Sequence, residues 1–214
     1  MFVLCLAFAA APAPPIWPER FHAVSVQTTP TGKSLVHLYY DFYRGRNLNI
    51  ITSQTREKQG TGTLWDYERD DGMSFYYAPS TKTCRSIDMK FGLVRPTFMV
   101  DDPPAKLVAE GVILGPYKTN VWTKGESDQP GVPFITYYAD VETGRPVRWV
   151  FYSPMELDII TYEPGVTLSE DQWKVPDYCS NATATQQVAR SAGADGMAAV
   201  RAWHARLSNG TVAM

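Results

Sequence analysis

The sequence predicts a mainly β protein, built as a single curved antiparallel sheet or half-barrel and followed by a C-terminal tail that is helical or disordered. Aromatic side chains make up 13% of the 214 residues, and they favour pleated, half-buried surfaces. Short runs of alternating apolar and polar residues recur about every ten to fifteen residues, with glycine, proline or aspartate turns between them. No helical period separates these runs, which favours antiparallel strands over βαβ units.

The clearest strand signal lies at residues 34–54, which read as two strands joined near Gly45. Glycine at the joint allows the positive φ that a tight reversal needs. Arg46 and Asn47, directly after it, are expected to hold the turn. Because side chains alternate between faces, one face should be core and the other a mixed surface. The core set is Val36, Leu38, Tyr40 and Phe42, and the second set is Leu35, His37, Tyr39, Asp41 and Tyr43.

The same alternation predicts strands on both sides of this hairpin. One precedes it at residues 21–28, and three follow at 64–68, 73–78 and 84–89. Residues 91–104 contain Pro96, Pro103 and Pro104, so we expect a long loop there that folds over the sheet. Further strands are expected at 107–114, 117–123, 134–139, 147–152 and 157–162, before an irregular closing segment at 168–179.

The two ends of the chain differ in composition from its middle. Residues 1–11 are apolar, end in small residues and precede a proline-rich lead, so we expect residues 1–13 to be a signal peptide. A frayed apolar N-terminus is the alternative. Residues 14–180 should form the half-barrel domain, and residues 181–214 a polar tail with a short helix at 197–207. No stretch is long and apolar enough for an integral membrane span.

Cysteine usage fits a secreted protein or one in the lumen of the secretory pathway. If Cys5 leaves with the signal peptide, Cys84 and Cys179 remain, and in an oxidising compartment they form the one available intramolecular disulfide. Two unpaired thiols in a cytosolic protein are the alternative. Asn181 and Asn209 each begin an Asn-x-Thr glycosylation sequon in the polar tail.

Charge and motifs exclude several classes of function. A net charge of -2 gives no electrostatic reason to expect a nucleic-acid partner. The sequence lacks the common nucleophile, zinc-protease and phosphate-loop motifs, and we expect no catalytic residue, no metal and no cofactor. His37 and Asp41 are about 13 Å apart along an extended strand, which is too far for a direct hydrogen bond, so a catalytic pair would need partners from other strands. Asp66 and Glu68 are the nearest match to an Asp-x-Asp metal pair, on a strand expected to be exposed.

The aromatic residues carry the most interpretable functional signal. They come from several strands, so a curved sheet would gather one set on its concave face. Such a face, apolar with a few polar groups, accepts a small apolar or amphipathic ligand. An ordinary packed core is the alternative. The candidate ligand-binding residues are His37, Tyr39, Asp41, Tyr43, Phe75, Tyr77, Tyr138 and Trp149.

Several short stretches also resemble a known family. They are Trp17-Pro-Glu-Arg-Phe-His, Leu38-Tyr-Tyr-Asp with Gly45-Arg-Asn, Phe75-Tyr-Tyr, Cys84-Arg-Ser, Asn120-Val-Trp, Arg145-Pro-Val-Arg-Trp-Val-Phe and Tyr178-Cys. In this order they resemble secreted plant and algal proteins of unknown function, some loosely labelled as glycosyl-group transferases. Some relatives carry a cysteine where this chain has Thr119. More distantly, the pattern is similar to ependymin-related proteins and lipoprotein-carrier half-barrels, whose concave sheets hold apolar ligands.

These observations favour a secreted protein that holds a small apolar or amphipathic ligand in the concave face of a half-barrel. A glycan-modifying enzyme, implied only by the label of the resembling family, is the first alternative. An extracellular structural or interaction module is the second. A non-enzymatic function is preferred, and the sequence leaves the oligomeric state open.

Overall fold

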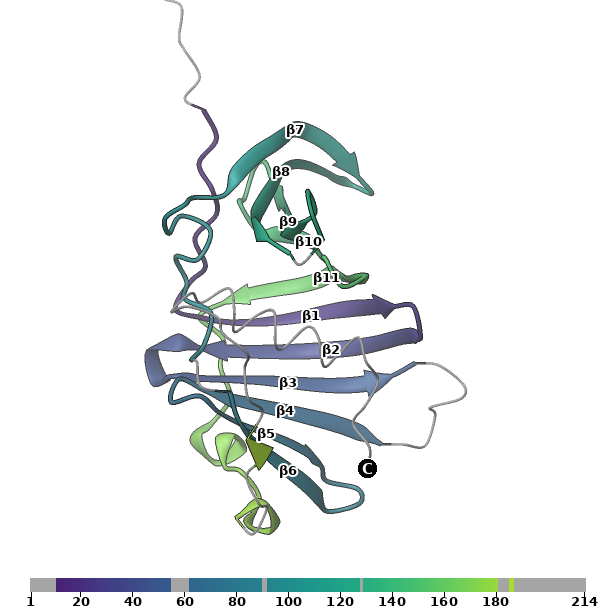
Figure 1. Cartoon of the computed structure of the whole chain (residues 1–214), viewed down its shortest axis with the longest axis vertical. Coiled ribbons are helices and arrows are strands. Elements are labelled where there is room, and N and C mark those ends of the chain that lie inside the picture. The colour runs from purple at the N-terminus through teal and green to yellow at the C-terminus, as the bar shows by residue number, and fades with distance from the viewer. Residues whose placement is uncertain (1–10, 55–61, 90–91, 128, 181–184, 187–214) are drawn as a thin grey trace, which may run out of the picture.

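The computed structural model describes residues 11–54, 62–89, 92–127, 129–180 and 185–186. Their strands form one sheet in the order β12-β6-β5-β4-β3-β2-β1-β11-β10-β9-β8-β7 (Figure 1). All neighbours are antiparallel except β12 (Thr185–Gln186), which lies parallel to β6. The mainly β, single-sheet prediction is therefore confirmed. Residues 1–10 of the expected signal peptide, both sequons and the expected 197–207 helix fall outside the described residues.

Two meanders build the sheet. The first contains β1 (Arg20–Thr29), β2 (Gly32–Asp41), β3 (Arg46–Ser53), β4 (Thr63–Arg69), β5 (Met73–Ala78) and β6 (Thr83–Asp88). The second contains β7 (Lys106–Leu114), β8 (Tyr117–Glu126), β9 (Pro133–Asp140), β10 (Pro146–Phe151) and β11 (Met155–Pro164). Pairing of β1 with β11 joins them. The helices of the described part are single 3₁₀ turns: η1 (Phe42–Arg44), η3 (Glu170–Trp173) and η4 (Asp177–Cys179).

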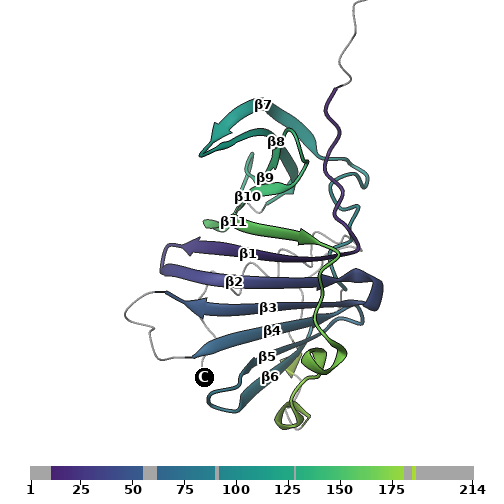
Figure 2. The same ribbon diagram turned by 180° about the vertical axis from the view of Figure 1, so that it is seen from behind.

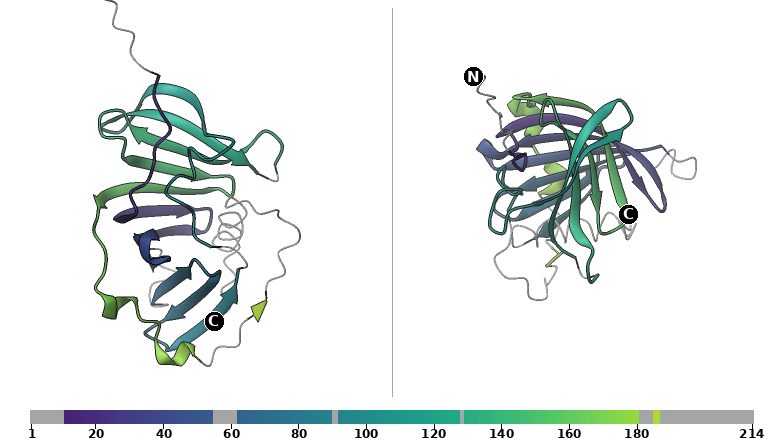
Figure 3. Two further views of the ribbon diagram at one scale, coloured as in Figure 1. Left: turned by 90° about the vertical axis from the view of Figure 1, so that its left-hand side faces the viewer. Right: turned by 90° about the horizontal axis from the view of Figure 1, so that it is seen from above.

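The sheet is curved and stays open. Register shifts occur between β1 and β11, between β9 and β10, and twice between β7 and β8, and such bulges bend a sheet and increase its twist. The strands step in an arc from β7 and β8 to β5 and β6, and the N-terminal stretch before β1 crosses the second meander (Figure 3). Because β12 and β7 end the strand order, the sheet is a half-barrel and not a closed barrel.

Each face of the sheet has its own apolar cluster. The first packs inward-facing residues of the second meander against the N-terminal stretch and the loop at 92–105; its members include Trp17, Phe98, Met99, Trp122, Phe134, Tyr137, Trp149, Phe151 and Leu157. The second lies on the opposite face of β3–β6, where the closing segment at 165–180 covers Leu48, Tyr67 and Tyr77. Figure 2 shows this segment running from the end of β11 past the ends of β1–β5 towards β6.

Candidate functional site

The candidate site is a cavity between the two meanders. Strands β2–β5 line one side and β9–β10 the other, although these groups lie several strands apart in the sheet, so the cavity is on the concave face. Its volume is about 90 Å³, counted as the space open to the centre of a water molecule, which is room for several waters. The lining residues are Trp17, Leu38, Tyr40, Asn47, Glu68, Arg69, Ser74, Met89, Gly92, Leu93, Val94, Phe98, Phe134, Ile135, Trp149 and Phe151.

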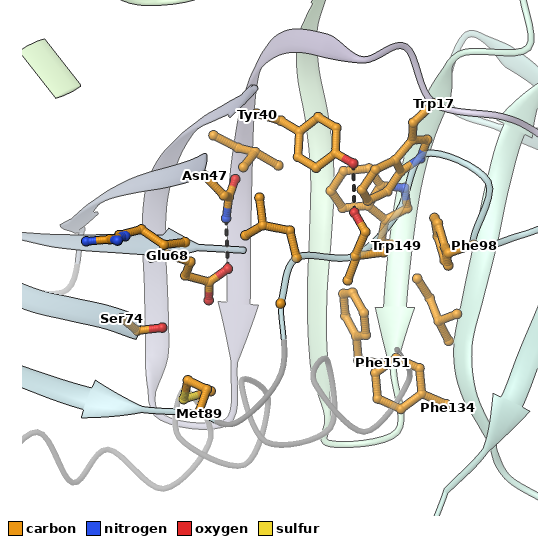
Figure 4. A pocket seen from close by; sticks show the side chains of 16 residues that line it. Trp17, Tyr40, Asn47, Glu68, Ser74, Met89, Phe98, Phe134, Trp149 and Phe151 are labelled. Atoms are coloured by element: carbon orange, nitrogen blue, oxygen red, sulfur yellow. Dashed lines mark hydrogen bonds between the residues drawn. The ribbon is translucent and has the colours of Figure 1, made fainter. Parts of the chain in front are cut away.

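Aromatic rings form the wall beside the second meander (Figure 4). Trp17 is central: its ring centroid lies 5.3 Å from that of Trp149 and 4.7 Å from that of Phe98. Its indole N–H donates to the Tyr137 hydroxyl at 3.2 Å, and its backbone N–H donates to Pro96. Burial raises the pKa of Tyr137 well above its usual range, against the opposing effect of the Trp17 and Trp149 indoles. This wall is therefore apolar and closely packed.

The opposite end of the cavity is polar. Asn47, Glu68 and Ser74 come from β3, β4 and β5, and cross-strand pairing places them side by side on one face. The Asn47 side-chain N–H donates to Glu68 Oε2 at 3.0 Å (Figure 4). Asn47 is 8% exposed and Ser74 is 2% exposed. The cavity thus has one aromatic wall and one end with hydrogen-bonding groups.

The loop at 92–105 covers the cavity as the sequence predicted, and three contacts hold it. The Tyr40 hydroxyl donates to the Val94 carbonyl at 2.7 Å, and Lys124 Nζ donates to the Asp101 carbonyl at 2.6 Å and to that of Pro103. The third contact is the Trp17–Pro96 hydrogen bond. Burial, with a smaller effect of Glu19, raises the pKa of Tyr40, so its hydroxyl remains a donor at neutral pH.

The eight ligand-binding candidates from the sequence do not form one group. Trp149 lines the cavity. His37 and Tyr39 alternate with the cavity-lining Leu38 and Tyr40, so they lie on the opposite face.

The other candidates also lie away from the cavity. Phe75 and Tyr77 belong to the cluster under the closing segment. Tyr138 alternates with the inward-facing Tyr137. Tyr43 is the middle residue of η1 and is 71% exposed. A binding role for these residues stays a prediction.

Asp41 instead lies at the centre of a charged network that fastens the hairpin to the closing segment. It is 0% exposed and accepts hydrogen bonds from Arg20 Nε at 2.9 Å and from Arg46 Nε and Nη2 at 3.1 and 3.0 Å. Arg46 also binds Glu170 through two bonds of 2.9 and 2.7 Å and lies over the Trp173 ring. Arg46 thus holds the turn, as expected. The side chain of Asn47 points into the cavity and does not hold the turn.

His37 takes part in a hydrogen-bonded chain on the outer face. Glu163 Oε2 lies 2.7 Å from His22 Nδ1, and His22 Nε2 lies 3.2 Å from His37 Nδ1. The Tyr39 ring stacks on His22 at a centroid distance of 4.3 Å. Burial, with a smaller effect of His22, lowers the pKa of His37. Among the described residues no group of three or more His, Cys, Asp or Glu side chains is arranged to hold a metal ion.

Sequence reasoning missed the polar end of the cavity. Asp66 and Glu68 were expected on an exposed strand, but Asp66 is fully buried and Glu68 lines the cavity. Their alternation with Trp65 and Tyr67 predicts that they share a face, yet only the curvature makes that face concave.

The Cys84–Cys179 disulfide is present, as predicted, and ties β6 to η4. No helix in the described part of the chain is long and apolar enough to cross a membrane.

Comparison with known proteins identifies the family. Residues 16–179 match the family described as Domain of unknown function (DUF8395). The chain belongs to this family. The matched range agrees with the extent of the motifs from Trp17 to Cys179, and it includes all residues of the cavity. A search among curated proteins finds no match.

Solved structures show similarity at the level of the fold. An uncharacterized conserved protein from Thermus thermophilus aligns with a TM-score of 0.53 and 15% identity, over 79% of this chain and 91% of that one. MucB in the Pseudomonas aeruginosa MucA/MucB complex aligns with a TM-score of 0.46 and 14% identity, over 75% of this chain and 56% of that one. A putative outer membrane lipoprotein-sorting protein domain from Vibrio parahaemolyticus aligns with a TM-score of 0.39 and 9% identity, over 73% of this chain and 89% of that one. The first of these supports the half-barrel fold.

Proposed function

We propose that this DUF8395 member binds a small apolar or amphipathic ligand in the concave cavity. The observation that carries the proposal is the cavity itself, which combines an aromatic wall with a small polar end between two halves of one sheet. Ligand sites are typically concave, mostly apolar and supplied with a few convergent polar groups. No arrangement of the described residues favours glycosyl-group transfer or a purely structural module.

We also propose that the protein works outside the cytoplasm. The Cys84–Cys179 disulfide supports this location, because such bonds persist in oxidising compartments. The expected signal peptide at residues 1–13 and the sequons at Asn181 and Asn209 agree with it. Secretion can be checked by expressing the full chain in a eukaryotic host and mapping the N-terminus and glycans of the protein in the medium.

The binding proposal is tested with N-phenyl-1-naphthylamine, an uncharged dye that becomes fluorescent in apolar sites. Leu93 lines the cavity from the covering loop, so Leu93→Trp should fill it and weaken dye binding at least about tenfold. Val166→Trp is the matched control, since Val166 is exposed and outside the cavity. Both variants should retain the circular dichroism of the parent. A parent protein without saturable binding, or equal binding by both variants, would overturn the proposal.

A further inference from the structure

The last described strand of the chain lies close to the cavity. β12 is parallel to β6 at the end of the strand order, with Gln186 level with Asp88. The residue after Asp88 is Met89, which is 5% exposed and lines the cavity. Because β12 runs in the same direction as β6, its C-terminal end points towards this lining residue.

The sequence beyond β12 contains the pattern of an amphipathic helix. Residues 187–214 lie outside the described part of the chain, and residues 197–207 among them are strong helix formers. On a helix Val200, Trp203 and Leu207 share one face, and Ala205 falls on the opposite face. An isolated helix of eleven residues is marginal in water. This segment therefore needs an apolar surface against which to fold.

Charge and reach both allow the segment to bind its own domain. Residues 187–214 contain three arginines and one aspartate, whereas the whole chain has 20 basic and 22 acidic residues. The end of the chain is thus basic and the part before it acidic, and opposite charges attract at long range. The 14 residues from Gln186 to Val200 can span about 46 Å, more than the length of about 33 Å of a ten-residue strand.

The cavity offers the apolar surface that such a helix needs. Its aromatic wall presents Phe134 from β9 and Trp149 and Phe151 from the neighbouring β10. Aromatic rings pair favourably with a further ring in offset or edge-to-face arrangements, and Trp203 would supply one. The surface is also concave, so it can enclose the apolar face of a helix and leave the polar face in water.

We propose that residues 197–207 dock as a helix over the concave cavity, with Val200, Trp203 and Leu207 against its aromatic wall. A ligand that enters the cavity must then displace this helix, so the C-terminal segment and the ligand compete for one surface. This inference rests on the proposed function and adds to it the way in which access to the cavity is regulated.

Photo-cross-linking in the full chain tests the docking. p-Benzoylphenylalanine replaces Trp203 in one variant and Ala205, on the opposite helix face, in the matched control. Irradiation of the first variant should join position 203 to peptides that contain the cavity-lining Met89 or Leu93, as mapped by mass spectrometry. The control should give at least tenfold less of these products.

Dye binding tests the competition. Trp203→Ser should bind N-phenyl-1-naphthylamine at least about tenfold more tightly than the parent, because the docked helix loses its aromatic contact. Ala205→Ser, the matched control, should bind the dye as the parent does. Saturating dye should in turn lower the yield of cross-links from position 203, because dye and helix cannot occupy the cavity together.

The outcomes separate this inference from the function on which it rests. Equal cross-linking from positions 203 and 205, or cross-links only to a second copy of the chain, overturns the inference, and ligand binding stands. Equal dye affinity of Trp203→Ser and the parent also overturns it. If position 203 cross-links to the cavity but neither the parent nor Trp203→Ser binds dye, the ligand proposal is overturned and the docked helix stands.

Discussion

Asp41 is a fully buried carboxylate whose charge is balanced by two arginines, Arg20 and Arg46. A buried charge is tolerated only when its partners are hydrogen-bonded to it, and removal of one partner leaves the charge uncompensated. The bond to Glu170, followed by the bond to Asp41, raises the pKa of Arg46 against the opposing effect of burial. One side chain therefore connects the β2–β3 turn with the closing segment.

We expect Arg46→Ala to lower the free energy of unfolding by about 3 kcal/mol, because Asp41 keeps only Arg20. Urea denaturation measures the loss. Lys174→Ala is the control, since Lys174 forms an exposed pair with Asp171 and exposed pairs contribute little. Equal losses in the two variants would show that the Asp41 network does not stabilise the fold.

His37 should make stability depend on pH near neutrality. Because its pKa is lower in the folded protein than the ordinary value of 6.5, the unfolded chain takes up the proton first as the pH falls. Stability is therefore full above that value, declines as the pH falls through it, and levels off below the pKa of the folded state. The urea midpoint between about pH 5 and pH 8 should show this slope in the parent protein. His37→Gln should reduce it, and an undiminished slope would contradict the assignment.

At the scale of the elements, the closing segment is held by covalent and non-covalent contacts at its two ends. Near its start Glu170 binds Arg46, and at its end Cys179 is bonded to Cys84, 95 residues earlier in the chain. Trp173 and Cys179 belong to the apolar cluster between these points, together with Leu48 and Tyr77. The segment therefore acts as a cover for the outer face of β3–β6.

Opening the disulfide should destabilise this part of the protein. Closing a loop of 95 residues contributes up to about 4–5 kcal/mol in the chain-entropy model. We expect Cys84→Ala combined with Cys179→Ala to lower the urea midpoint strongly, and a reductant to have the same effect on the parent only. Non-reducing peptide mapping should show the linked cysteines. A midpoint that is the same with and without the bond would contradict its structural role.

The sequence predicted elements more completely than it predicted their arrangement. Alternation placed nearly every strand and identified Leu38 and Tyr40 as inward-facing, because this signal is local. The cavity depends on β2–β5 facing β9–β10, which follows from the β1–β11 pairing and the bulges. Trp17 lines the cavity for the same reason. No local pattern encodes which face becomes concave, and for this reason the sequence points to His37 and Tyr39 and not to Asn47 and Glu68.

At the scale of the whole molecule, the β1–β11 pair should make the two meanders unfold together. Leu157 is a buried residue of β11, and Leu157→Ala should cost about 2–5 kcal/mol. Hydrogen exchange should then accelerate in β2–β5 as well as in β8–β10. Ile160→Ala is the control, because Ile160 lies at the bulge of the same strand and is 55% exposed. Faster exchange in the second meander alone would show that the halves unfold independently.

Because β1 lies between β2 and β11, its two neighbours in the sheet are synthesised at different times. A ribosome makes β1 and β2 early, but the other neighbour of β1 begins only at Met155. At cellular translation rates this delay is on the order of ten seconds. During that interval the six-stranded intermediate ends in an unpaired strand edge, the kind of surface on which nascent chains mispair. One edge that the nascent protein exposes to mispairing, β1, thus lies in the interior of the finished sheet.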